Sequence, residues 1–99
     1  MTDLDRALRA FAHPTRRALV LLLDDLDAGW ITVPEATTRL RDASEGVDER
    51  RLRIELVHSH LPALDDAGVI AYDRRGERIE LRPPSPAVAD LIEVCRAHE

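Results

Sequence analysis

Apolar residues recur at helical spacing through the first quarter of the chain. Leu4, Leu8 and Phe11 follow one another at i, i+4 and i+7, which predicts one face of a short helix. Pro14 suits the first turn of a second helix, whose broad apolar stripe consists of Ala18, Leu19, Leu22, Leu23 and Leu26. The segment Asp27-Ala28-Gly29 then ends this helix.

A short apolar pair separates the second helix from the third. Trp30 and Ile31 form either a short strand or an apolar plug. Thr32 and Glu35 have the spacing of a capping box, in which each side chain satisfies the other's backbone donor. This spacing predicts a third helix at about residues 33–43, followed by a polar, glycine-containing turn.

A fourth helix is predicted at about residues 48–61, with Asp48 as its cap. A wheel at 100° per residue puts four apolar residues on one side, which we expect to be buried: Ile54, Val57, Leu61 and Leu64. The opposite side carries Arg51, Glu55 and His58. Pro62 lacks an amide hydrogen and should kink or split the helix, and Gly68 should close it as a left-handed cap.

Two β-prone runs follow at once, Val69–Tyr72 and Arg78–Leu81, and the loop between them contains a glycine. They predict an antiparallel hairpin over about residues 69–82. Ser85-Pro86 then starts a last helix at about residues 85–97, with an apolar face of Val88, Leu91, Ile92 and Cys95.

The order of these elements predicts the fold class. Two helices joined by a turn, the second running straight into a hairpin, are typical of the winged helix-turn-helix. We therefore expect a mainly α chain with four helices, a two-stranded β-hairpin wing and a C-terminal helix. One domain should span residues 1–99, with its core at about 4–82 and the last helix available for dimerisation.

The charge balance narrows the possible partners. All 14 basic residues other than histidine are arginine, and they face 19 acids, which gives a net charge of −5. This balance argues against indiscriminate binding to polyanions, yet it leaves room for a local basic face. A lysine-free chain rich in aspartate favours a high-salt cytoplasm, although a high-GC genome is another source of the arginines.

Several function classes lack their usual sequence support. No apolar run approaches the length of a membrane span, and the start of the chain does not resemble a secretory signal, so we expect a cytoplasmic protein. His58 and His60 are two apart on a helix and point in different directions, and Cys95 with His98 makes only half a zinc site. No nucleophile motif, phosphate loop or metalloprotease motif occurs. We expect no enzyme activity, no cofactor and no metal, and the sequence makes no small-molecule ligand evident.

Two segments resemble a known family. The run His60-Leu61-Pro62-Ala63-Leu64-Asp65-Asp66-Ala67-Gly68-Val69-Ile70 resembles the H-L-x-x-L-x-x-A-G-[LV]-[IV] signature of ArsR-type winged-helix repressors, and Ala12-His13-Pro14-Thr15-Arg16 resembles their A-x-P-x-R helix opening. The whole chain also resembles a small, functionally uncharacterised type of winged-helix domain that is abundant in halophilic archaea. The C-x-C metal pair of classical ArsR sensors is missing, so the resemblance does not imply metal sensing.

This resemblance implies a DNA-binding transcriptional regulator. The fourth helix would be the recognition helix, with Arg51, Glu55, His58 and Ser59 towards the major groove, while Arg74, Arg75 and Arg78 on the wing would lie near phosphates. Arg50 and Arg53 complete the basic cluster at the start of that helix, and arginine suits both guanine and phosphate. The alternative is an ordinary solvated face balanced by Glu49, Glu55 and Glu77.

The terminal helices are the expected surface of a homodimer. ArsR-like relatives pair through such helices, which implies an interface of Leu4, Leu8, Phe11, Val88, Leu91, Ile92 and Cys95. The alternative is that both helices simply cover the core of one chain. The leading hypothesis is a homodimer that binds specific sequences in double-stranded DNA. Its rival is a protein-interaction or dimerisation adaptor on the same fold, which the net charge of −5 supports.

Overall fold

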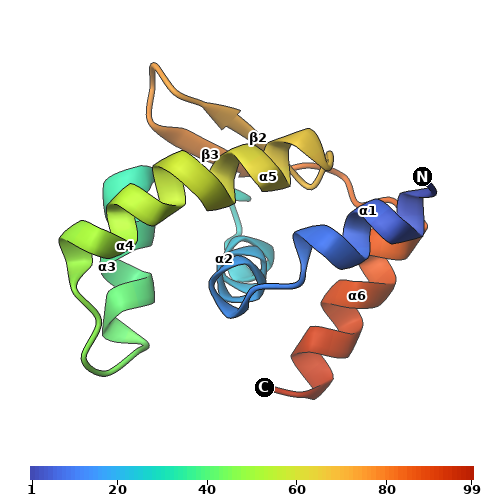
Figure 1. The fold of residues 1–99 in the computed structure, drawn as a ribbon, viewed down its shortest axis with the longest axis horizontal. Coiled ribbons are helices and arrows are strands. Elements are labelled where there is room, and N and C mark those ends of the chain that lie inside the picture. Colours follow the sequence, from blue (N-terminus) through green and yellow to red (C-terminus); the bar gives the residue numbers. More distant parts are fainter.

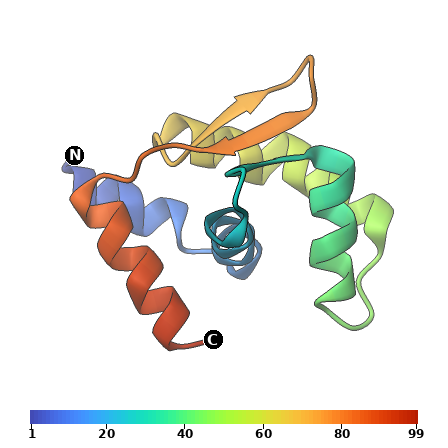
Figure 2. The same cartoon turned by 180° about the vertical axis from the view of Figure 1, so that it is seen from behind.

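A computed structural model describes all residues 1–99 as a mainly helical chain with a small sheet (Figures 1 and 2). The helical elements are α1 (Asp3–Ala10), α2 (Pro14–Asp25), α3 (Val33–Asp42), α4 (Glu49–Glu55), the π-helical segment η1 (Leu56–His60), α5 (Leu61–Asp66) and α6 (Pro86–Ala97). The strands are β1 (Trp30–Thr32), β2 (Ile70–Asp73) and β3 (Arg78–Leu81). No helix has the combination of length and apolar character needed to cross a membrane.

The sheet is antiparallel and has the strand order β1-β3-β2. The predicted hairpin is therefore present, but β1 adds a third strand along the other side of β3, so Trp30 and Ile31 form a strand and not a plug. Ile79 of β3 pairs with Ile31 on one side and with Tyr72 on the other. Beyond β1, the Val33 amide donates to the Glu77 carbonyl at 2.8 Å, which attaches the start of α3 to the end of the hairpin loop.

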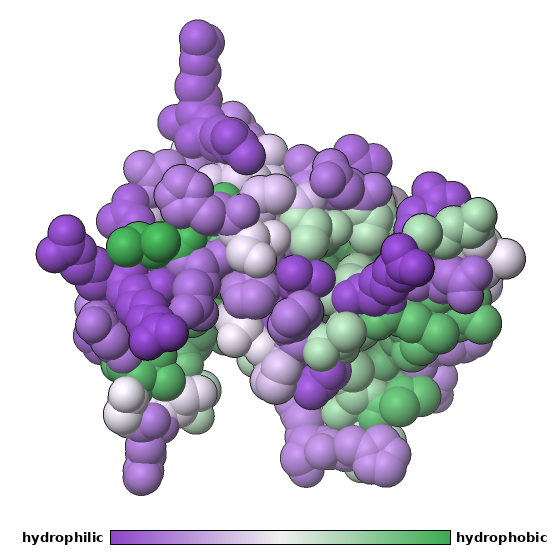
Figure 3. All heavy atoms as spheres, viewed as in Figure 1, coloured by the Kyte–Doolittle hydropathy of each residue, from purple (hydrophilic) through white to green (hydrophobic).

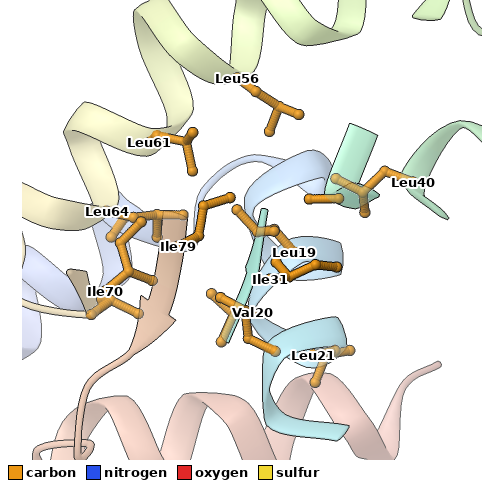
Figure 4. Close-up of a cluster of buried hydrophobic side chains, with 14 of the residues drawn as sticks. Leu19, Val20, Leu21, Ile31, Leu40, Leu56, Leu61, Leu64, Ile70 and Ile79 are labelled. Atoms are coloured by element: carbon orange, nitrogen blue, oxygen red, sulfur yellow. The ribbon is translucent and has the colours of Figure 1, made fainter. Parts of the chain in front are cut away.

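Helix α2 lies at the centre of the molecule, with α3 on one side and α1 and α6 on the other (Figures 1 and 2). The sheet and the long helix formed by α4, η1 and α5 cover it from the remaining side. Figure 4 shows the side chains of this core converging from α2, the sheet, α3 and the long helix. Its fully buried members include Leu19, Leu23, Leu56, Leu61, Leu64, Ile70 and Ile79. Each such side chain contributes about 1.5–3 kcal/mol through removal of apolar surface from water.

Helix α1 buries its alanines and not its leucines. Ala7, Ala10 and Phe11 are buried, whereas Leu4 and Leu8 are 52% and 49% exposed. The short alanine side chains allow α1 to lie close against α6, the helix with which it packs most extensively. In the last turn of α6, Arg96 pairs with Asp24 at 2.6 Å and with Asp25 at 2.9 Å and thereby links this helix to α2.

Candidate nucleic-acid interface

Helices α3 and α4 are joined by the turn at residues 43–48 and are held together by one carboxylate. Glu49 accepts a hydrogen bond from Thr38 at 3.0 Å and pairs with Arg41 at 2.9 Å. Asp48 caps the start of α4, as predicted, by accepting from the Arg50 amide at 3.0 Å. Because Glu49 stands in the first turn of α4, these contacts fix the start of that helix against the end of α3.

Only half of the capping box predicted at the start of α3 forms. The Thr32 hydroxyl accepts from the Glu35 amide at 3.3 Å, as expected. The Glu35 carboxylate turns outward instead and pairs with Arg39 one turn later, at 2.9 Å. A complete capping box occurs at the start of α1, between Thr2 and Asp5.

The helix that begins at Glu49 continues past Pro62 to Asp66 without being split, contrary to one of the two predicted outcomes (Figure 1). The accommodation is the π-turn η1, in which the Leu61 amide donates to the Leu56 carbonyl five residues earlier. A proline amide cannot donate to the carbonyl four residues before it, and the proline ring crowds that carbonyl. A π-turn just before Pro62 widens the helix where this conflict falls. Gly68, at φ +76°, then ends the helix as predicted.

The π-turn changes which residues of this helix face the core. Leu52, Leu56, Leu61 and Leu64 are buried, whereas Ile54 is 51% exposed and Val57 is half-buried. The prediction that Ile54 lies on the buried side is therefore wrong. A helical wheel assumes a constant rotation per residue, whereas the additional residue in the π-turn shifts the phase of Leu61 and Leu64 relative to Ile54, which precedes the turn. The outward row of α4 and η1 consists of Arg50, Ile54 and His58, all exposed.

The hairpin loop is built from short-range contacts that leave two arginines in solvent. The Asp73 carboxylate accepts from the Arg75 amide at 3.1 Å and so closes the loop on itself. A Cβ at Gly76 would lie 2.7 Å from the Asp73 carboxylate, so a larger residue there would displace that side chain. Arg74 is exposed, as is Arg75, and neither forms an ion pair.

The long helix and the hairpin loop are connected by an ion pair between Arg53 and Glu77 at 3.1 Å. Between them lies a shallow groove of about 370 Å³ whose lining includes Ile54, Val57, His58, Tyr72 and Arg74. The two elements therefore present one surface, formed by the outward row of the helix on one side and by the loop arginines on the other.

The predicted DNA-contacting residues divide into two groups. Five are exposed and form neither an ion pair nor a side-chain hydrogen bond within the chain: Arg50, His58, Ser59, Arg74 and Arg75. The others have partners in the chain. Arg51 pairs with Glu55 at 3.1 Å, and Arg78 lies over the Trp30 ring, with its guanidinium carbon 4.1 Å from the centroid. Sequence reasoning missed Ile54, because the wheel assigned it to the core.

His60 differs from its neighbour His58 in being buried, at 8% exposure. The Arg16 Nε–H donates to the His60 Nδ1 at 3.0 Å, and the His13 ring stands 5.6 Å from the His60 ring, centroid to centroid. Burial, followed by the positive charge of Arg16 and by His13, lowers the pKa of His60 below its ordinary 6.5. Because Nδ1 accepts a hydrogen bond, His60 is neutral in this arrangement.

Acidification should therefore destabilise the fold through His60. Above the ordinary pKa of 6.5 the imidazole is neutral in both the folded and the unfolded chain. Below it the unfolded chain binds a proton that the folded chain does not, so the free energy of unfolding falls. Urea titrations at a series of pH values should show a shallower fall for His60→Asn, which retains an acceptor for Arg16 but does not titrate. Parallel curves for the two proteins would exclude His60 as the source.

The residues predicted to form a dimer interface fall into a buried group and an exposed group. Phe11, Val88 and Ile92 belong to the core of the single chain, and Leu91 and Cys95 are half-buried against it. Leu4 and Leu8 remain exposed, together with Val94 of α6, which is 54% exposed. Figure 3 shows apolar residues gathered over α1 and α6 on this side of the molecule.

The chain matches a family described as "Domain of unknown function (DUF7344)" over residues 8–80. The matched range runs from the end of α1 through the last strand, and so contains α3, the long helix and the hairpin. No curated protein and no solved structure matches the chain. Because the match covers most of its length, the chain belongs to the DUF7344 family of domains of unknown function.

Proposed function

We propose that this chain is a winged helix-turn-helix protein that binds specific sequences in double-stranded DNA as a homodimer and regulates transcription. The observation that carries the proposal is the common surface of the long helix and the hairpin loop, connected through Arg53 and Glu77. In this proposal α3 and α4 are the helix-turn-helix, the long helix enters the major groove, and the hairpin is the wing. An exposed helix of this kind fits the width of the major groove.

The charges on that surface support DNA as the partner in preference to the adaptor alternative. Its acidic side chains are engaged within the chain: Glu55 with Arg51, Glu77 with Arg53, Glu49 with Arg41, and Asp73 and Asp48 with backbone amides. Arg50, Arg74 and Arg75 have no such partner. An acidic protein can therefore offer a local set of free guanidinium groups to a polyanion.

The free side chains suit two kinds of contact. Arg50 and His58 stand on the outward row of the helix, so they are the candidates for hydrogen bonds to base edges. Arg74 and Arg75 stand in the loop at the tip of the hairpin, so they are the candidates for phosphate contacts. Phosphate contacts set the register of the protein on DNA, whereas base contacts distinguish sequences.

The test is selection from a random duplex library with the full chain, followed by fluorescence anisotropy on the enriched duplex and on a scrambled duplex of equal length. We expect saturable binding with a preference of at least about 1,000-fold for the enriched sequence, the usual lower bound for specific DNA-binding proteins. The titration is repeated from low to molar salt, because phosphate attraction weakens steeply as salt rises. Equal binding to both duplexes, or none to either, would exclude the proposed function.

The homodimer is proposed through the exposed leucines of α1 and through Val94 of α6. These side chains leave apolar surface that a second copy of the chain would cover, and two copies would read two half-sites. The Leu4→Glu/Leu8→Glu variant should weaken self-association at least tenfold in sedimentation equilibrium and should leave the free energy of unfolding of the monomer nearly unchanged. Ala28→Glu, in the exposed loop after α2, is the charge control. A wild-type chain that stays monomeric at hundreds of micromolar would contradict the dimer.

A further inference from the structure

Ile54 is the one large apolar side chain on the outward row of α4 and η1. It is 51% exposed and lies one helical turn from Arg50 and one turn from His58. The core beneath this part of the helix is already filled by Leu52 and Leu56, so Ile54 contributes little to it. About half of the Ile54 side chain is therefore exposed to solvent between two polar residues.

The groove beside Ile54 contains one guanidinium without an ion-pair partner, that of Arg74, and no unpaired carboxylate. Its lining also includes Arg53 and His58, and its single carboxylate, Glu77, is paired with Arg53. Val57 is half-buried in the same groove and extends the apolar surface of Ile54 towards Tyr72. An apolar group that belongs to an anionic molecule suits this combination of apolar surface and free guanidinium.

The major groove of DNA offers such a group. Every base edge in that groove presents hydrogen-bond donors or acceptors, and thymine alone adds an apolar C5-methyl group. We infer that Ile54, supported by Val57, determines specificity by packing against a thymine methyl group. This inference rests on the proposed function, and it names a base that the arginines cannot select. Residues one turn apart on a helix are separated by about 6 Å, so the thymine should lie within about two base pairs of the base contacted by Arg50.

The experiment replaces thymines of the enriched duplex one at a time by deoxyuridine, which lacks only the C5-methyl group. Binding of the wild-type chain should weaken about fourfold at one position in each half-site, the effect expected for one buried methyl group. The same replacement should leave the affinity of Ile54→Ala unchanged. Arg75→Ala, in the hairpin loop but outside the groove that contains Ile54, is the matched control: it should weaken binding to both duplexes equally and retain the fourfold difference between them.

Salt provides a second readout. The wild-type deoxyuridine effect should be the same at low and at molar salt, because it involves no counterion, whereas the Arg75→Ala effect should shrink as salt rises. Selective binding by the wild-type chain with no deoxyuridine position coupled to Ile54 would overturn the inference and leave the proposed function intact. A chain that binds no duplex selectively would overturn both.

Discussion

Replacing the three free arginines of the helix and the wing, in the variant Arg50→Ala/Arg74→Ala/Arg75→Ala, should weaken binding to the enriched duplex by on the order of 100-fold at low salt. These guanidinium groups form no ion pair in the free protein, so they can bind DNA without the loss of an intramolecular interaction. Their removal should also leave the fold intact, since all three side chains are exposed. The slope of the logarithm of affinity against the logarithm of salt should fall by about one for each phosphate group that is no longer bound.

The reduction in positive charge would weaken binding even if these arginines did not contact DNA. A second variant separates the loss of direct contacts from the change in net charge. Arg6→Ala/Arg9→Ala/Arg82→Ala removes the same charge from exposed arginines that form no ion pair and stand outside the proposed surface. Anisotropy on the same duplex should show a decrease of only a few fold for this control, mostly from the reduced long-range attraction. Equal decreases in the two variants would show that the arginines act through total charge, and the proposed surface would have to be abandoned.

Structural features that depend on a few consecutive residues were predicted well. The cap at Asp48, the closing glycine at Gly68 and the hairpin around Gly76 each depend on the geometry of one turn, and all three are present. The second strand partner of β3 was not predicted. It depends on β1, which lies far from β3 in the sequence, and a three-residue strand carries little periodicity.

The buried face of the long helix was predicted wrongly for a physical reason. In α1 the buried positions are alanines as well as Phe11, and a pattern weighted by large apolar residues does not identify them. In the long helix the spacing of five residues between Leu56 and Leu61 suits a π-turn, which a regular wheel cannot represent. Pro62 indicated that the helix would be perturbed at this point, but not that it would continue with a shifted phase.

Which arginines form ion pairs could not be predicted from the sequence either. Arg53 meets Glu77, 24 residues away, and Arg96 meets Asp24, 72 residues away, so only the folded chain decides which guanidinium groups remain free. The sequence therefore predicted the elements that carry the proposed surface, but not which of its charges are available or that an isoleucine stands among them.

Leu56→Ala should lower the free energy of unfolding by about 3 kcal/mol, whereas Ile54→Ala two residues earlier should change it by less than about 1 kcal/mol. Leu56 is fully buried at the start of the π-turn, so its truncation leaves a cavity that α2 and the sheet cannot readily fill. Ile54 is half-exposed, and alanine is the better helix former, which offsets the small reduction in packing. Urea titrations of both variants at one pH measure the difference. The regular wheel predicts the reverse order, with Ile54 the costly residue, so this pair tests the shifted phase directly. If Ile54→Ala proved the more destabilising variant, the helix would be α-helical through Pro62, Ile54 would face the core, and the surface proposed to contact thymine would not exist.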